Sequence, residues 1–202
     1  LCLGLLSAQA QWMTQTVTMS KGWNAVYLQV SPGLACHSLF TGTPVKIIHQ
    51  FNPALSAQYE TSPAQPLERA PEWLTWRSGA SNSLPPTLFS LQAGQGYLVS
   101  NDAPCSLVLT GRVENIRRTW RPDDWHLTGL DVEPGAGVTF EQFFGAAMDR
   151  IDKLQRVDSD GISRAIASSA AIEPGRAYWI KTKGHLDSDG PFALEGGIWL
   201  NA

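Results

Sequence analysis

Apolar and polar residues alternate along several short stretches of the chain, most clearly after Trp23. Val26, Leu28 and Val30 fall on one side of a two-residue period, which predicts a strand with one apolar face. The preceding stretch TQTVTMS favours β structure and the letters SKG can turn the chain, so a hairpin is expected here. Trp23 lies on the other side of the period. It must either cap the core through a bulge or cover the opposite face of the sheet.

A different periodicity occurs once, in the stretch TFEQFFGAAMDRI at residues 139–151. Its apolar residues recur at helical spacing, and Thr139 with Gln142 forms a capping-box pattern. We expect one short α-helix over about 139–151, with its apolar stripe packed in a core. The stretch CHSLF near residue 36 predicts a single helical turn at the matching place.

Three stretches of the pattern recur in the same order. KGWNAVYLQVSP (21–32) matches DDWHLTGLDVEP (123–134), and LQAGQGYLVS (91–100) matches IEPGRAYWIK (172–181). LVLTG and FALEG then close the two copies. These matches predict a tandem duplication. The expected fold is all-β, with two related small β-sandwich or barrel-like domains at 11–112 and 113–202.

The first copy is longer in its middle, where residues 59–86 are rich in Pro and Ser and show no sustained period. This stretch is expected to be a loop insertion. It contains Trp73 and Trp76, with Tyr59 nearby. Exposed aromatic side chains on a β scaffold can stack on sugar rings or anchor a protein, so these three residues are the candidate ligand-binding residues. The alternative is that the two Trp residues fold back as a lid over the first core.

Residues 1–10, LCLGLLSAQA, have the apolar run and the small-x-small ending of a signal-peptide remnant. The alternative is a buried N-terminal strand. Export to the cell surface or the extracellular space is therefore expected, with no membrane span in the mature chain. An oxidising compartment would favour a disulfide between Cys36 and Cys105, the alternative being two buried free thiols. The ending GGIWLNA suggests further domains in a longer chain.

The phrases GWNAVYLQVSP, LQAGQGYLV and LVLTG, with their second copies, resemble a repeat of secreted bacterial multidomain proteins. That repeat has a G-W-N-x-V opening, a turn followed by a G-x-G-Y-W strand, and a closing L-x-L-x-G. The resemblance covers nearly all of the mature chain and implies small β domains of a surface or exported protein. It carries no catalytic residues to transfer. The second copy departs from it, with Asp124 and His126 where Gly22 and Asn24 stand.

Charge and motifs exclude several classes of function. A net charge of -3 offers no basic surface for nucleic acid. The chain has no G-x-S-x-G elbow, its four His residues occur singly, and no cofactor motif follows a βαβ pattern, so no catalytic residue and no cofactor is expected. The stretch DSDG occurs twice and offers weak calcium candidates, although Asp and Gly also suit plain turns. The candidate carboxylates are Asp158, Asp160, Asp187 and Asp189.

We therefore expect a non-enzymatic exported module for adhesion, assembly or presentation at a bacterial surface, with a protein or a glycan as its partner. The alternative is a carbohydrate-binding accessory module of a secreted hydrolase, and a small secreted enzyme is a third hypothesis. A carbohydrate module predicts an exposed aromatic row. An assembly module predicts an apolar patch or an open strand edge, and an enzyme predicts a pocket with clustered carboxylates.

Overall fold

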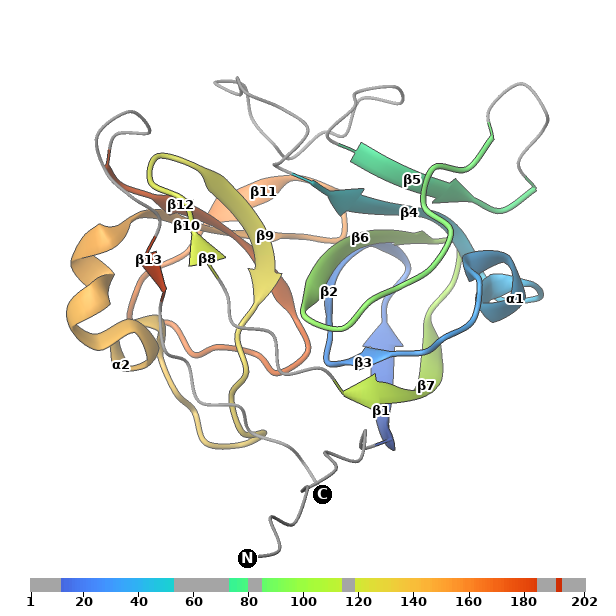
Figure 1. The fold of residues 1–202 in the computed structure, drawn as a ribbon, viewed down its shortest axis with the longest axis horizontal. Helices are drawn as coiled ribbons and strands as arrows, with labels where there is room; N and C mark the ends of the chain where they lie inside the picture. Colours follow the sequence, from blue (N-terminus) through green and yellow to red (C-terminus); the bar gives the residue numbers. More distant parts are fainter. Residues whose placement is uncertain (1–11, 53–72, 80–84, 114–118, 185–191, 194–202) are drawn as a thin grey trace, which may run out of the picture.

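The computed structural model describes residues 12–52, 73–79, 85–113, 119–184 and 192–193, so the expected signal remnant lies outside the described residues. The predicted all-β class is confirmed. A first half, blue to green in Figure 1, and a second half, yellow to red, lie side by side. No helix in these ranges is long and apolar enough to cross a membrane.

Two antiparallel sheets form the first half. A three-stranded sheet of order β1-β7-β3 faces a four-stranded sheet of order β2-β6-β4-β5. The strands are β1 (Trp12–Met19), β2 (Gly22–Leu28), β3 (Val30–Ser31), β4 (Val45–Phe51), β5 (Trp73–Arg77), β6 (Gln95–Asn101) and β7 (Cys105–Val113). A buried apolar cluster that includes Val17, Val26 and Leu109 fills the space between the two sheets.

The second half repeats the four-stranded sheet in the order β11-β10-β12-β9 and adds the strand pair β13-β8. Its strands are β8 (Thr119–Trp120), β9 (Trp125–Gly129), β10 (Ile151–Val157), β11 (Ser163–Ala165), β12 (Ala177–Thr182) and β13 (Phe192–Ala193). A separate apolar cluster, which includes Phe140 and Tyr178, fills this half.

Strand register is the same in the two four-stranded sheets. Val26 pairs with Tyr97 between β2 and β6, and Thr128 pairs with Tyr178 between β9 and β12. Each copy also has a register shift at the start of its next strand, β4 in the first half and β10 in the second. Since the aligned phrases place Val26 on Thr128 and Tyr97 on Tyr178, the matching pairs support a tandem duplication.

A tyrosine fixes the turn before the central strand in each half. The Tyr97 hydroxyl accepts a hydrogen bond from the backbone N–H of Gln92 at 2.8 Å, and the Tyr178 hydroxyl accepts one from Glu173 at 2.8 Å. Gly94 and Gly175 lie in these turns with φ of 74° and 75°, which glycine adopts without strain. The repeated turn therefore depends on the same two residue types in both copies.

Short helical segments connect β-strands in each half: α1 spans Cys36–Phe40 and α2 spans Phe140–Phe144. The predicted capping box at Thr139 is present. The α-helix expected over 139–151 is shorter than predicted, because Gly145 takes a φ of 50° and a 3-10 turn replaces the helix over Gly145–Arg150. Ile151 already belongs to β10.

The middle of the first copy is not a loop throughout, so that expectation is wrong in part. Trp73–Arg77 forms β5, which pairs with β4 and corresponds by register to β11 in the second half. Trp73 packs in a cluster on one face of the sheet and Trp76 in the first-half core on the other. Because both faces of this strand are buried, its sequence lacks the alternation that marks a half-exposed strand.

A third apolar cluster, which we call the junction core, joins the two halves. It forms where the outer faces of the four-stranded sheets meet, and Trp23 and Trp125 are partly buried at its margin. Trp23 therefore covers the face opposite the first core, one of the two placements expected. The buried residues of the junction core are Ala25, Tyr27, Phe51, Trp73, Leu98, Leu127, Val157, Ala177 and Trp179.

Candidate functional site

The two Trp residues proposed as part of a contact surface are buried. Trp73 and Trp76 are 6% and 5% exposed, and Tyr59 lies outside the described residues. The Trp73 ring lies 5.2 Å from Phe51 and 5.9 Å from Trp179, in the junction core. The expectation of exposure is wrong because pairing of β5 with β4 turns each Trp into a different core.

Cys36 and Cys105 are both free thiols, so the predicted disulfide is absent. The backbone N–H of Cys36 donates to the Phe89 carbonyl, ahead of the start of β6, at 2.8 Å, whereas Cys105 lies beside Asn101 at the other end of β6. The two residues are therefore held near different ends of this strand, where a disulfide cannot form. Burial raises the pKa of Cys36 to about 11, so this thiol is uncharged at neutral pH.

The first DSDG stretch forms the turn between β10 and β11, and Arg side chains already bind its carboxylates. Arg164 donates to Asp158 and Asp160, each at 2.6 Å, and Arg156 donates to Asp158 at 2.9 Å. The hydrogen bond from Arg164 lowers the pKa of Asp160 to about 2. Within the described ranges, no group of three or more His, Cys, Asp or Glu is placed to hold a metal ion. Asp187 and Asp189 lie outside these ranges.

This turn instead docks onto the first half. The backbone N–H of Trp23 donates to the Ser159 carbonyl at 2.9 Å. A Cβ atom at Gly161 would lie 2.7 Å from the Trp23 ring, so only glycine leaves the indole enough room. The repeated Trp and the DSDG turn therefore act together in holding the two halves against each other.

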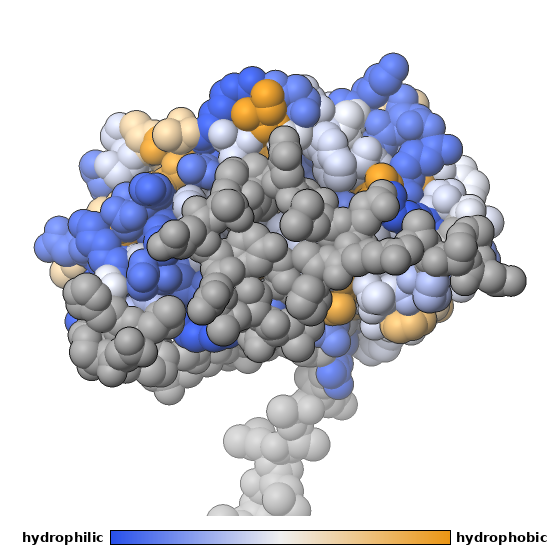
Figure 2. Space-filling view, turned by 90° about the horizontal axis from the view of Figure 1, so that it is seen from above, coloured by the Kyte–Doolittle hydropathy of each residue, from blue (hydrophilic) through white to orange (hydrophobic). Residues whose placement is uncertain are grey.

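Exposed hydrophobic side chains are scattered over the described surface. Those that are large and more than half exposed are Trp12, Leu34, Phe89, Val108 and Ile162. On the face shown in Figure 2, hydrophobic residues form small patches separated by hydrophilic ones. In the described part of the chain these residues do not form the row of aromatic rings that a carbohydrate-binding face would present.

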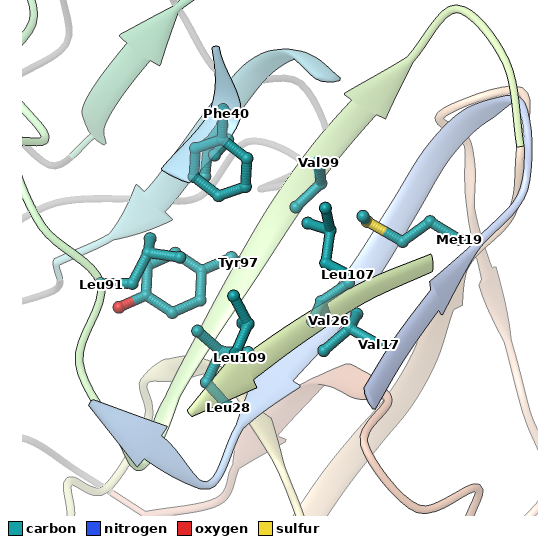
Figure 3. Close-up of a pocket in the computed structure, with 11 residues that line it drawn as sticks. Val17, Met19, Val26, Leu28, Phe40, Leu91, Tyr97, Val99, Leu107 and Leu109 are labelled. Atoms are coloured by element: carbon teal, nitrogen blue, oxygen red, sulfur yellow. The ribbon is translucent and has the colours of Figure 1, made fainter. Parts of the chain in front are cut away.

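A small cavity lies in the first core, between the β1-β7 pair and β2, β6 and β4 (Figure 3). It has a volume of about 20 Å³ and entirely apolar walls, including Val17, Leu28 and Leu109. A space of this size and polarity stays dry and leaves no room for a substrate. We regard it as a packing defect of the core.

An open groove of about 510 Å³ lies at the junction of the two halves. Its first wall is β1, its second is the start of β2, and its third is the turn that precedes β12. The lining residues are Gln15, Thr16, Val17, Thr18, Ser20, Asn24, Ala25, Val26, Glu173, Pro174, Gly175 and Arg176. We call this site the junction groove.

Hydrogen bonds hold all three walls of the junction groove. The Gln15 side chain donates to the Tyr27 carbonyl at 2.9 Å and accepts from the Gln29 N–H at 2.8 Å, which ties β1 to the end of β2. Asn24 exchanges two bonds of 2.9 Å with the Ser20 backbone and so fixes the β1–β2 turn. The Tyr27 N–H donates to the Gly175 carbonyl at 2.8 Å and holds the third wall in place.

The chemistry of the junction groove is that of a polar binding site. Three residues that carry hydroxyl groups, Thr16, Thr18 and Ser20, line it, and its two charged side chains, Glu173 and Arg176, are paired with each other at 2.5 Å. No single motif in the sequence marks this site, because its walls come from stretches about 150 residues apart. The Thr-rich stretch TQTVTMS is the part of the sequence that could indicate a polar surface here, but its pattern by itself predicts only a strand.

His49 is the buried titratable side chain of the junction core. It is 3% exposed and stacks on Trp23 at 5.8 Å, and its Nδ1 is hydrogen-bonded to the Thr75 hydroxyl at 2.8 Å. Burial, aided by the positive charge of Arg77, lowers its pKa from 6.5 to about 4. The folded protein therefore keeps this ring neutral in mild acid.

We expect the stability of the protein to fall between pH 6.5 and pH 4, because the unfolded chain binds a proton at His49 while the folded chain does not. This difference in the pKa of His49 between the unfolded and the folded chain corresponds to about 3 kcal/mol of unfolding free energy. His49→Gln introduces the residue that the second copy has at the equivalent position, Gln155. This variant should lose less stability between pH 6.5 and pH 4 than the wild type. Urea unfolding at pH 7, 5.5 and 4 measures the change. Parallel profiles for the two proteins would contradict it.

In comparisons with known proteins, no family model, no curated protein and no solved structure matches the chain. The geometry of the junction groove and the sequence patterns therefore carry the functional proposal.

Proposed function

We propose that the chain is a non-enzymatic exported module that binds a partner in adhesion, assembly or presentation at a bacterial surface. The observation that carries this proposal is the junction groove, a rigid polar site bordered by an open strand edge. In the described part of the chain, the sheet order gives β1 a neighbour on one side only, β7. An open edge is the feature that distinguishes an assembly module from a carbohydrate module or an enzyme.

The lining of the groove also supports binding. Hydroxyl and amide groups supply hydrogen bonds without a net charge, which suits recognition of an uncharged polymer backbone. The resemblance to repeats of secreted multidomain proteins points to the same setting, as does the expected signal remnant.

Carbohydrate binding is the second candidate, and one observation favours it. Trp12 is 66% exposed at the start of β1, opposite Arg112 and beside a hydroxyl pair, Thr14 and Thr110, whose oxygens lie 2.9 Å apart. An indole ring next to hydroxyl groups is a surface on which a sugar can stack. Trp12 and Thr14 do not line the junction groove, although they share the exposed face of β1 with Thr16 and Thr18, so variants at the two ends of the strand can distinguish the two sites.

The test is retention of the tagged protein on purified bacterial cell envelopes. Thr18 lines the groove and is exposed, so Thr18→Arg should fill the groove and reduce retention about tenfold or more. Ser106→Arg is the matched control, since Ser106 pairs with Thr18 but lies on β7, away from the open edge. Equal retention of wild type and Thr18→Arg would contradict the proposal. Loss of retention only in Trp12→Ala, together with sensitivity to periodate treatment of the envelopes, would favour the glycan candidate.

A further inference from the structure

Among the residues that the structure describes, strand β1 pairs with β7 alone, so its other edge is open along its full length. It pairs with β7 over eight residues, from Trp12 with Arg112 to Met19 with Cys105, with no register shift. Alternate backbone N–H and C=O groups of β1 therefore point away from β7, toward the junction groove. Such a row of unpaired groups is a template for another strand.

Three other strand edges of the described chain are short or covered. The edge strand β5 is covered by Thr87 and Leu88, whose N–H groups both donate to the Thr75 carbonyl. β2 is covered by the contacts of Trp23 with Ser159 and of Tyr27 with Gly175. β11 has three residues and carries Arg164 in an ion-pair network. Natural proteins use devices of this kind to prevent edge pairing.

β1 has none of these protections. Its sequence WMTQTVTM contains no charged residue, no Pro and no Gly, and its Thr and Val residues favour β structure. A long, regular, uncharged edge is an aggregation hazard if it stays exposed in a soluble protein. The edge is therefore best explained as a strand-accepting site.

The walls of the junction groove indicate what such a strand is like. The side chains of Ala25 and Val26 on the second wall are buried in the junction core and the first core, whereas Thr16 and Thr18 on the first wall are exposed. An incoming strand points alternate side chains to opposite faces of the sheet. Uncharged polar residues suit the face of Thr16 and Thr18, and apolar residues suit the inner face, where Val17 and Met19 of β1 pack in the first core.

We propose that β1 accepts an extended polypeptide segment of a partner protein, which lies in the junction groove and adds to the sheet as an extra strand. This inference rests on the proposed binding function of the groove and names its ligand class. The segment must be a single strand that is not already paired in a sheet of the partner. β2 and the Glu173–Arg176 turn lie opposite β1 and leave no room for a second strand beside it. A second copy of this chain would bring β7 along with its own β1 and meet these walls.

The experiment measures hydrogen exchange of the β1 amides with a synthetic peptide as the probe. The probe has the sequence of Ser106–Thr110, which is uncharged and already pairs with β1 in the protein as part of β7. In the free protein, the alternate amides that point away from β7 should exchange rapidly. The peptide should slow them about tenfold or more, and the same peptide with Pro in place of its central residue should not, because Pro cannot donate to a ladder.

A matched pair of variants tests the location. Thr16→Lys places a charge on the open edge and should abolish the protection. Val108→Lys places the same charge on its register partner in β7, which is 67% exposed, and should leave the protection intact. Thr14→Lys replaces Thr16→Lys if the latter lowers the melting temperature.

Three results would overturn the inference: outward β1 amides already protected in the free protein, no effect of the peptide, or equal losses in the two Lys variants. Protection that instead rises with protein concentration alone would assign the edge to a second copy of the chain. If any of these occurs while Thr18→Arg still abolishes envelope retention, the groove binds a ligand other than a strand and the proposed function stands. If retention is also unaffected, both proposals fail.

Discussion

Replacing Trp179 with Ala is expected to lower the free energy of unfolding by about 3–5 kcal/mol and to destabilise both halves together. Trp179 is fully buried in the junction core, and its ring meets Phe51 at 5.1 Å and Trp73 at 5.9 Å, both from the first half. Its Nε1 has no hydrogen-bond partner among the described residues, so the cost is almost entirely one of lost packing. The cavity would open between the two four-stranded sheets.

Urea unfolding followed by tryptophan fluorescence and by far-ultraviolet circular dichroism measures this effect. Trp12→Ala is the control, since Trp12 is 66% exposed and its loss should change stability by no more than about 0.5 kcal/mol. A single transition shifted to lower urea supports a shared junction core. Two transitions, with only the second half affected, would show that the halves fold independently.

Much of the fold could be predicted because local patterns and the repeat agreed. The period of two around Val26 predicted β2, and the aligned Tyr97 and Tyr178 predicted equivalent central strands. The Thr139 capping box predicted the start of α2. Each of these features depends on residues that are close in sequence or repeated in it, which is why the sequence reveals them.

Packing of one half against the other could not be predicted in the same way. Trp73 and Trp76 look like exposed loop residues because their strand is buried on both faces. The ends of β6 separate Cys36 from Cys105, a distance that no spacing along the chain reveals. The junction groove is built from β1, β2 and the Glu173–Arg176 turn, so it exists only after the halves have docked.

The junction core has the character of a symmetric dimer interface within one chain. Ala25 and Leu127 occupy equivalent register positions, and so do Leu98 and Trp179, and all four are buried in the junction core. Equivalent patches that meet each other are the mark of a two-fold interface. The duplicated chain thus presents one sheet face twice and buries both copies against each other.

The symmetry is broken at one contact, between Tyr27 and Gly129, where identical side chains could not both fit. Tyr27 and Gly129 are equivalent positions that meet in the junction. A Cβ atom at Gly129 would overlap Tyr27 at its Cβ and Cγ atoms, which are near the backbone and cannot swing away. The Tyr27 hydroxyl reaches across to Asp131 at 3.2 Å. Two tyrosines at this pair of positions would collide, and two glycines would leave a void.

Gly129→Ala should therefore destabilise the protein by about 3 kcal/mol through overpacking. Backbone strain adds nothing to this cost, because the φ of Gly129 is not positive and other residues adopt it freely. Tyr27→Gly should also be costly, since it removes a buried ring. The double variant should cost at least about 1 kcal/mol less than the sum of the two, because removal of the Tyr27 Cβ and ring clears the space that the new methyl group takes. Urea unfolding of the four proteins measures this coupling. Additive effects would mean that the two positions do not touch and that the halves pack differently.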